Sequence, residues 1–157
     1  MRDDTNLEFD TVLTRRLHPD DLERVVALDA KVVGRRRDEY FETKLKMAIA
    51  ETGVEVSLAA EIDDAFVGFL LARVFYGEFG NLEPVAVLDT IGVHPDFRKL
   101  GVGHALLDQL GKNLRGLGIP SLQTEVNWED QTLLSFFHHE GFNPAARLCL
   151  DLKIAGR

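Results

Sequence analysis

Residues 93–103 read Val93-His94-Pro95-Asp96-Phe97-Arg98-Lys99-Leu100-Gly101-Val102-Gly103. The segment places a basic turn with two glycines between an apolar strand and an amphipathic helix. Backbone N–H groups at the start of a helix attract phosphate oxygens, because the positive end of the helix dipole lies behind them. Glycine at 101 and 103 lets a phosphate approach the main chain closely. The segment therefore predicts a binding site for a diphosphate. The buried face of the helix is expected to consist of Leu106, Leu107, Leu110, Leu114 and Leu117.

The spacing of the glycines excludes two common phosphate-binding motifs. A dinucleotide fingerprint, G-x-G-x-x-G, needs a third glycine, but Leu106 stands in its place. A P-loop needs G-K-[ST], which occurs nowhere in the chain. What remains is R-x-x-G-x-G, from Arg98 to Gly103, after a Val-x-Pro strand end. The alternative is that the two glycines only shape a loop and a helix start.

The R-x-x-G-x-G pattern resembles the acetyl-CoA-binding signature of the Gcn5-related N-acetyltransferase (GNAT) family. A second segment, Thr124-Glu125-Val126 followed by residues 133–142, is similar to the strand, helix and strand that end this family's fold. The family's helix commonly ends in F-Y-x-x-x-G-F, and here Phe136-Phe137 and Gly141-Phe142 occupy those positions. The two motifs cover about residues 89–142, whereas the first third of the chain matches only in the order of its elements.

The resemblance implies that acetyl-CoA, used as a substrate, donates an acetyl group directly to a primary amine, either on a small molecule or at a protein N-terminus. It implies no metal, and it leaves a homodimer open. Among the branches of the family, the chain resembles the ribosomal-protein alanine acetyltransferases. The residues that the resemblance places against the coenzyme are Ile91, Val93, Arg98, Lys99, Leu100, Gly101, Val102, Gly103, His104, Phe136 and Phe137.

The resemblance also gives candidates for the general base. Glu125 lies twelve residues before Phe137, the offset at which that branch carries a glutamate before its tyrosine. Asp89 is the alternative, because other branches place their acidic residue on the preceding strand, and Glu83 is a third candidate. The alternative for each of these three carboxylates is that it is an ordinary surface or strand-end group with no catalytic role.

This chain departs from the family at the general acid, the residue that protonates the leaving group. The tyrosine that commonly protonates the leaving thiolate is replaced by Phe137, which has no proton to give. The remaining proton donors for the thiolate are His138, His139 and water. Because a thiol has a pKa of about 8.5, a thiolate leaves tolerably well without immediate protonation, so we expect activity to be lowered and not abolished. A module that binds acyl-CoA without turnover, and an unrelated phosphate binder, are the alternatives.

Composition limits the possible functions. The net charge of −8 argues against a nucleic-acid binder and suits a cationic substrate. The run Arg35-Arg36-Arg37 is expected to be solvated surface, with a contact to a substrate carboxylate or phosphate as the alternative. Cys149 is the only cysteine, so it is either a packing residue or a thiol nucleophile. The polar start of the chain and its short apolar runs predict a cytoplasmic protein.

The 157 residues are expected to form one domain of mixed α/β class. We expect a central, mostly antiparallel sheet, with a parallel pair of strands splayed around the coenzyme and helices on both faces. Predicted strands are 11–16, 56–62, 66–75, 85–93, 121–126 and 142–152, the second and third of them a hairpin, and predicted helices are 19–33, 38–49, 102–116 and 130–140.

Overall fold

The computed structural model describes residues 12–50 and 54–156. The chain divides into two compact units, one up to Glu125 and one from Val126 onward. The prediction of a single domain stays a prediction. The strands are β1 (Leu13–Arg16), β2 (Leu58–Ile62), β3 (Ala65–Phe75), β4 (Val85–Val93) and β5 (Leu122–Thr124). The helices are α2 (Leu22–Val33), α3 (Asp38–Leu45), α4 (Val102–Gly116) and α5 (Gln131–His139), with short helical turns η1 (Pro19–Asp21), η2 (Lys46–Ala50), η3 (Glu78–Gly80) and η4 (Pro95–Leu100).

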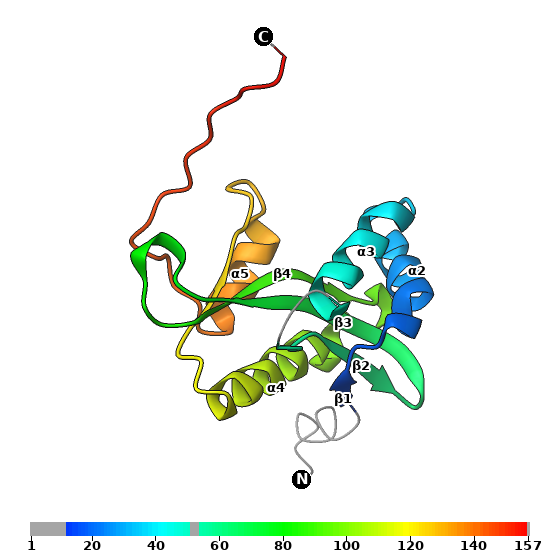
Figure 1. Ribbon diagram of the computed structural model, residues 1–157. Coiled ribbons are helices and arrows are strands. Elements are labelled where there is room, and N and C mark those ends of the chain that lie inside the picture. The colour runs from blue at the N-terminus through cyan, green and yellow to red at the C-terminus, as the bar shows by residue number, and fades with distance from the viewer. Residues whose placement is uncertain (1–11, 51–53, 157) are drawn as a thin grey trace. The chain divides into compact units, whose positions relative to one another are not determined.

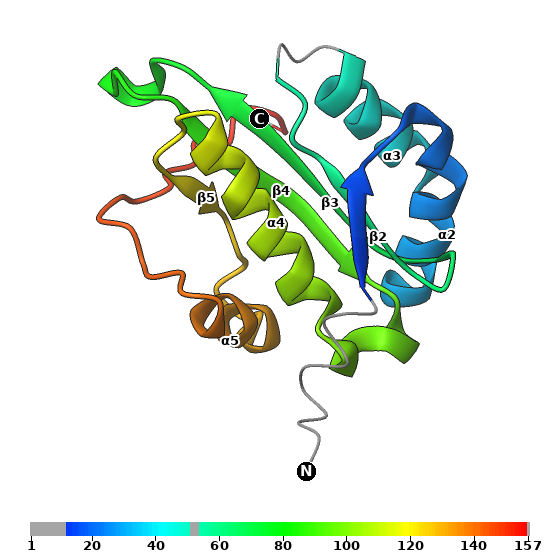
Figure 2. The ribbon, with the colours of Figure 1, turned by 90° about the horizontal axis from the view of Figure 1, so that it is seen from below.

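The first unit is built on a five-stranded sheet in the order β1-β2-β3-β4-β5. The first three pairings are antiparallel, and β4 pairs with β5 in parallel. Helix α4 connects these two parallel strands and packs on one face of the sheet, while α2 and α3 lie on the other (Figures 1 and 2). The predicted mixed α/β class, with helices on both faces, is confirmed.

The predicted hairpin joins β2 to β3. Asp63 and Asp64 form its two-residue loop, and both have positive φ angles, 48° and 65°. Two successive positive φ angles define a type I′ turn, whose twist matches that of antiparallel strands, and aspartate tolerates this conformation better than most residues. The turn pairs Ile62 with Ala65 and fixes the register of the hairpin.

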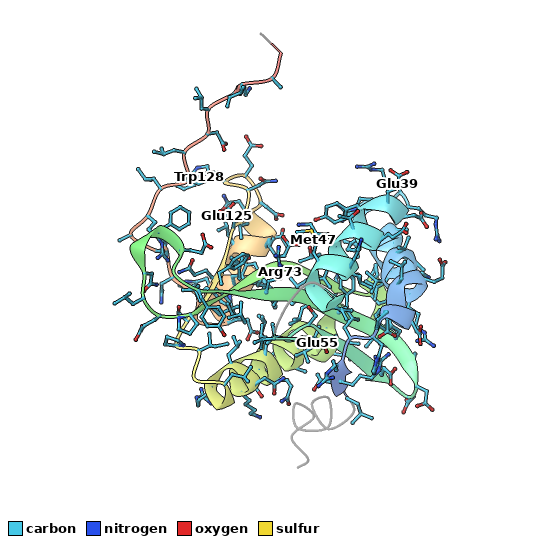
Figure 3. The ribbon with its side chains drawn as sticks, viewed as in Figure 1. Glu39, Met47, Glu55, Arg73, Glu125 and Trp128 are labelled. Carbon is cyan, nitrogen blue, oxygen red and sulfur yellow. The ribbon has the colours of Figure 1, made fainter. Side chains whose placement is uncertain are left out.

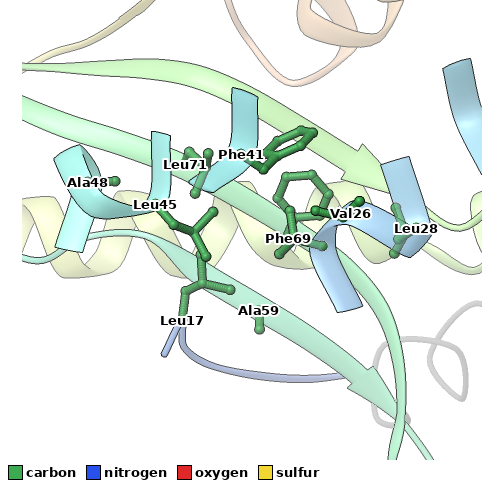
Figure 4. Close-up of a cluster of buried hydrophobic side chains, with 10 residues drawn as sticks. Leu17, Val26, Leu28, Phe41, Leu45, Ala48, Ala59, Phe69 and Leu71 are labelled. Atoms are coloured by element: carbon green, nitrogen blue, oxygen red, sulfur yellow. The ribbon is translucent and has the colours of Figure 1, made fainter. Parts of the chain in front are cut away.

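One hydrophobic cluster fills the space between the sheet and the helices α2 and α3 (Figure 4). Phe41 of α3 meets Phe69 of β3 edge to face, with ring centroids 5.7 Å apart. Edge-to-face pairs add to the stabilisation that burial itself gives. The cluster consists of Leu17, Val25, Val26, Leu28, Phe41, Leu45, Ala48, Ala59, Phe69 and Leu71. Both helices therefore bury an apolar face against the sheet.

On the opposite face, the start of α4 approaches β3 at a glycine. A Cβ atom added to Gly68 would lie 2.7 Å from Val102 Cγ1 and 3.2 Å from the carbonyl oxygen of Gly92. Val102 and Leu106 of α4 are fully buried. Gly68 thus provides the space in which the first turn of α4 packs on the sheet.

A buried carboxylate ties β1 to the start of α2. Asp21 is 1% exposed and accepts two hydrogen bonds of 2.8 Å from the guanidinium of Arg15. It also accepts hydrogen bonds from Arg24 and from the backbone N–H of His18. Burial by itself raises the pKa of Asp21, but the hydrogen bonds from Arg15, His18 and Arg24 outweigh it and lower this pKa to about 2.

The second unit contains α5, which ends within one residue of its predicted limit. The Asp130 side chain accepts a hydrogen bond from Leu133 N–H and caps the start of the helix. The predicted strand over 142–152 is wrong, because residues 142–156 contain no strand and Leu148, Leu150 and Leu152 are 87%, 85% and 77% exposed. Alternating apolar residues form a strand only where a neighbouring strand accepts their backbone hydrogen bonds. Cys149 is exposed, so the packing interpretation of this thiol is also wrong.

Replacing Gly68 with alanine is expected to destabilise the protein by about 1–3 kcal/mol, because the new methyl group overlaps Val102 and the β4 backbone. The matched control is Gly111→Ala in the interior of α4, where an added Cβ meets nothing within 4 Å. This control is expected to stabilise the protein by about 0.5–1 kcal/mol. Urea unfolding measures both changes, and a Gly68→Ala protein as stable as the wild type would refute the close approach.

The lowered pKa of Asp21 predicts an acid-sensitive contribution to stability. Because the folded-state pKa of about 2 lies below the ordinary 3.8, this contribution is fully present above pH 3.8 and is lost as the pH falls toward 2. Asp21→Asn is expected to remove about 2 kcal/mol at pH 7 and to flatten the loss of stability in acid. The control is Asp20→Asn at the exposed neighbour. Urea unfolding at pH 7 and between pH 4 and pH 2 tests this, and equal effects of the two substitutions would contradict it.

Candidate functional site

A β-bulge in β4 marks the centre of the candidate site. In the register of β3 and β4, Leu71 pairs with Thr90 and Ala72 pairs with Leu88, which leaves Asp89 as the extra residue. A bulge bends its strand and turns the side chain of the extra residue in a new direction. The bulge therefore sets the direction of the side chain of Asp89, one of the three candidates for the general base.

Strands β4 and β5 part at the same point. Their parallel register ends with Leu88 opposite Thr124, and the hydroxyl of Thr124 donates a 2.8 Å hydrogen bond to the carbonyl of Leu88. Within the described residues, the part of β4 after Leu88 has β3 as its only strand neighbour. Ile91 and Val93, which the resemblance to the family predicts to contact the coenzyme, lie on this part of β4. The predicted splayed pair of strands is confirmed.

Two hydrogen bonds at His94 hold the turn between β4 and α4. The N–H of His94 donates to the carbonyl of Val67 at 2.8 Å, and His94 Nδ1 accepts from Asp96 N–H at 3.1 Å. Turn η4 then leads to Gly101, whose φ of 78° lies in the left-handed region that favours glycine. This conformation turns the chain into the first residue of α4.

The start of α4 has the features that an anion site requires. The helix has 15 residues, and no side chain caps its N-terminus. Arg98 and Lys99 are exposed on the turn before it. The first backbone N–H groups of a helix and the dipole behind them favour a bound anion, and the two cations add to this attraction. The residues of the predicted diphosphate site thus lie together and fit a diphosphate.

Asp89 has a partner that sequence reasoning missed. The ammonium nitrogen of Lys44, on α3, lies 3.1 Å and 3.3 Å from the two carboxylate oxygens of Asp89. Both side chains are about one-third exposed. No motif predicts this pair, because the two residues are 45 positions apart and meet only once α3 packs over the sheet.

The other predicted base candidates lie on exposed backbone. Glu125 follows the last residue of β5 directly, and its side chain, labelled in Figure 3, is exposed. Its backbone is therefore fixed beside the point at which β4 and β5 part. Glu83 lies in the exposed loop before β4, where its N–H donates to the side chain of Asn81.

Phe136 and Phe137 belong to the second unit. Phe137 is 5% exposed, and its ring centroid lies 4.9 Å from that of Phe142 and 5.4 Å from that of Phe136. Phe137 is thus an apolar packing residue of its own unit. Nδ1 of His139 lies 2.9 Å from the carbonyl oxygen of Ser135. The coenzyme contacts of the two phenylalanines, and the donor of the final proton, stay predictions.

The arginine run is engaged within the chain. Arg36 pairs with Glu23 and Asp38, and Arg37 donates two hydrogen bonds of 2.6 Å and 2.8 Å to Asp29. These pairs join α2 to the start of α3. Arg36 and Arg37 are therefore structural residues, and the interpretation of the run as merely solvated surface is too simple.

Residues 12–50 and 54–156 contain no group of three His, Cys, Asp or Glu side chains that would hold a metal ion. No helix in these ranges combines the length and the apolar character needed to cross a membrane.

Comparison with solved structures shows the same fold in several acetyltransferases. The aminoglycoside 6'-N-acetyltransferase AAC(6')-Ih from Acinetobacter baumannii is 18% identical, with a TM-score of 0.75 over 92% of this chain and 99% of the other. The aminoglycoside N-acetyltransferase AAC(6')-Iy is 20% identical, with a TM-score of 0.73 over 90% and 94%. The ribosomal-protein-alanine N-acetyltransferase from Brucella melitensis biovar Abortus 2308 is 21% identical, with a TM-score of 0.72 over 92% and 99%.

A match to a protein-family model identifies the family to which the chain belongs. The model of the Acetyltransferase (GNAT) family matches residues 20–142, which is more than half of the chain. The matched range includes the bulged strand β4, the glycine turn and the whole of α4. With this match the resemblance seen in the R-x-x-G-x-G turn is confirmed, and the chain belongs to the GNAT family of acetyltransferases.

Proposed function

We propose that this chain transfers an acetyl group from acetyl-CoA to a primary amine by direct attack in a ternary complex. The observation that carries the proposal is the parted edge of β4, which leads through the R-x-x-G-x-G turn into the uncapped start of α4. The similar protein AAC(6')-Iy has been solved with CoA and with a bisubstrate analogue that joins CoA to acetylneamine.

In this proposal the coenzyme is bound mainly by backbone groups. The N–H groups at the start of α4, over residues 101–104, donate to the diphosphate, and Arg98 and Lys99 add positive charge. The pantetheine lies along β4 beside Ile91 and Val93. A backbone N–H on this strand donates to the thioester carbonyl oxygen, which gains negative charge during the reaction.

The chemistry requires one proton acceptor and one proton donor. The amine nitrogen attacks the thioester carbon, a C–N bond forms, the C–S bond breaks, and the amine proton passes to the carboxylate of Glu125. Asp89 is the second candidate for this base. The thiolate takes its proton from water, His138 or His139, because Phe137 has none to give.

The acceptor is a small amine or a protein N-terminus. At pH 7 roughly a tenth of an α-amino group of pKa 7.7–8.0 is neutral, against far less than a hundredth of a lysine side chain of pKa 10.4. With one modest base, an amine of low pKa is the easier substrate. The negative net charge of the chain favours acceptors that carry positive charge. A cytoplasmic location and a homodimer remain parts of the proposal.

A second candidate function rests on one observation, the apolar packing of Phe137 at the position of the usual acid. In this alternative the chain binds acyl-CoA without turnover. Both functions require coenzyme binding, so the release of free thiol across a panel of amines separates them.

Arg98→Ala is expected to raise the Kd for acetyl-CoA about tenfold, because a hydrogen-bonded charge on the diphosphate is lost. The control is Arg115→Ala, an exposed arginine at the other end of α4. Titration calorimetry measures Kd, and a thiol-release assay with polyamines, amino acids, aminoglycosides and peptide N-termini measures turnover. Equal affinities of the two variants would refute the contact between Arg98 and the diphosphate, and tight binding without thiol release would favour the binding module.

Glu125→Gln is expected to lower kcat by about 10²–10⁴-fold, with the largest loss at low pH, where fewer acceptor amines are neutral. The affinity for acetyl-CoA is expected to stay unchanged. Asp89→Asn is the comparison, since Asp89 is the other base candidate. Initial rates between pH 6 and pH 9 test the assignment, and a Glu125→Gln enzyme with wild-type rates would remove Glu125 from the base role.

A further inference from the structure

Lys44 places a primary ammonium group in a site made by two other side chains. Its nitrogen lies within 3.3 Å of both carboxylate oxygens of Asp89 and 5.7 Å from the centre of the Tyr40 ring. A carboxylate and an aromatic face are the two groups that proteins use to bind alkylammonium ions. The structure thus shows a primary ammonium bound by Asp89 and Tyr40, and the ammonium comes from the chain itself.

This ammonium lies beside the proposed reaction site. Asp89 is the extra residue of the β4 bulge, one position after the last pairing between β4 and β5. Lys44 reaches it from α3, across the face of the sheet that carries α2 and α3. The site is therefore formed by the same stretch of β4 that is proposed to carry the thioester.

The pair differs from the ion pairs that stabilise the fold. The carboxylates of Asp21 and Asp29 are nearly fully buried, with side chains 2% and 7% exposed, and each accepts two hydrogen bonds from one arginine guanidinium. The pair of Lys44 and Asp89 is about one-third exposed and joins a flexible single-nitrogen donor to a bulge residue. Ion pairs open to water contribute little to stability, so another cation is able to replace Lys44.

We propose that Lys44 and a cationic group of the acceptor compete for Asp89. In the free protein Lys44 occupies the ammonium site of Asp89 and Tyr40. When the acceptor binds, one of its ammonium groups replaces Lys44, while a second amine of the acceptor is the one that reacts. The substrate class is therefore a di- or polyamine, or a peptide with a basic residue near its N-terminus. This inference rests on the proposed function and makes Lys44 a specificity-determining residue.

The test uses 1,4-diaminobutane as the probe, with 4-amino-1-butanol as the amine that lacks a second charge. Lys44→Ala is expected to lower the Kd of the full-length protein for diaminobutane about three- to fivefold. The reason is that the exposed ion pair of Lys44 with Asp89 must be broken before diaminobutane binds, and breaking such a pair weakens binding by about that factor. The Kd for aminobutanol is expected to change less. NMR titration in the absence of acetyl-CoA measures both values.

Two variants separate this site from a general effect of charge. Lys46→Ala removes the same charge from an exposed position two residues away and is expected to leave the Kd nearly unchanged. Adding Asp89→Asn to Lys44→Ala is expected to abolish the gain in affinity. Equal effects of Lys44→Ala and Lys46→Ala, or a gain that survives Asp89→Asn, would overturn the inference.

The same titrations distinguish this inference from the proposed function. If Lys44→Ala shifts the Kd as expected but no amine releases thiol from acetyl-CoA, the ammonium site stands and the enzyme activity fails. If thiol is released and Kd is the same in both lysine variants, the activity stands and competition by Lys44 is refuted.

Discussion

Parallel pairing of β4 and β5 stops after Leu88 and Thr124, and the extra residue of the bulge, Asp89, follows at once. A sheet that continued to pair beyond this point would cover the edge of β4 with a neighbouring strand. Because the pairing stops, residues 89–93 have an edge without β5, and this edge leads directly into the turn before α4. The parts of the proposed site that belong to the first unit therefore depend on this divergence, the point at which β4 and β5 part.

Packing on the two faces of the sheet holds the divergence in place. On one face, Gly68 lets Val102 and Leu106 lie against β3, which fixes the start of α4 at the end of β4. On the other face, Phe41 packs on Phe69 and places α3 over the same strands. Lys44 lies one helical turn after Phe41, so the packing that stabilises the first unit also brings Lys44 to Asp89.

The sequence predicted the features that depend on local rules. The glycine turn, the Asp63-Asp64 hairpin and the leucine face of α4 as far as Leu114 follow from backbone conformation and periodicity over a few residues. Leu117, which was also expected on that face, is 54% exposed because α4 ends at Gly116. The pair of Lys44 and Asp89 was not predictable in this way, because it joins residues that meet only in the folded unit. The expected strand after Phe142 shows the same limit, since alternation describes one face of a strand but does not supply the neighbour that a strand needs.

We propose above all that acetyl-CoA lies where β4 and β5 part, with its diphosphate on the first N–H groups of α4. Amide hydrogen exchange, measured with and without saturating acetyl-CoA, tests this claim directly. We expect exchange to slow at residues 91–93 and 101–104, while β1 and the hairpin loop at Asp63-Asp64 stay unchanged. Unaltered exchange at residues 101–104, in a protein that binds acetyl-CoA, would contradict it.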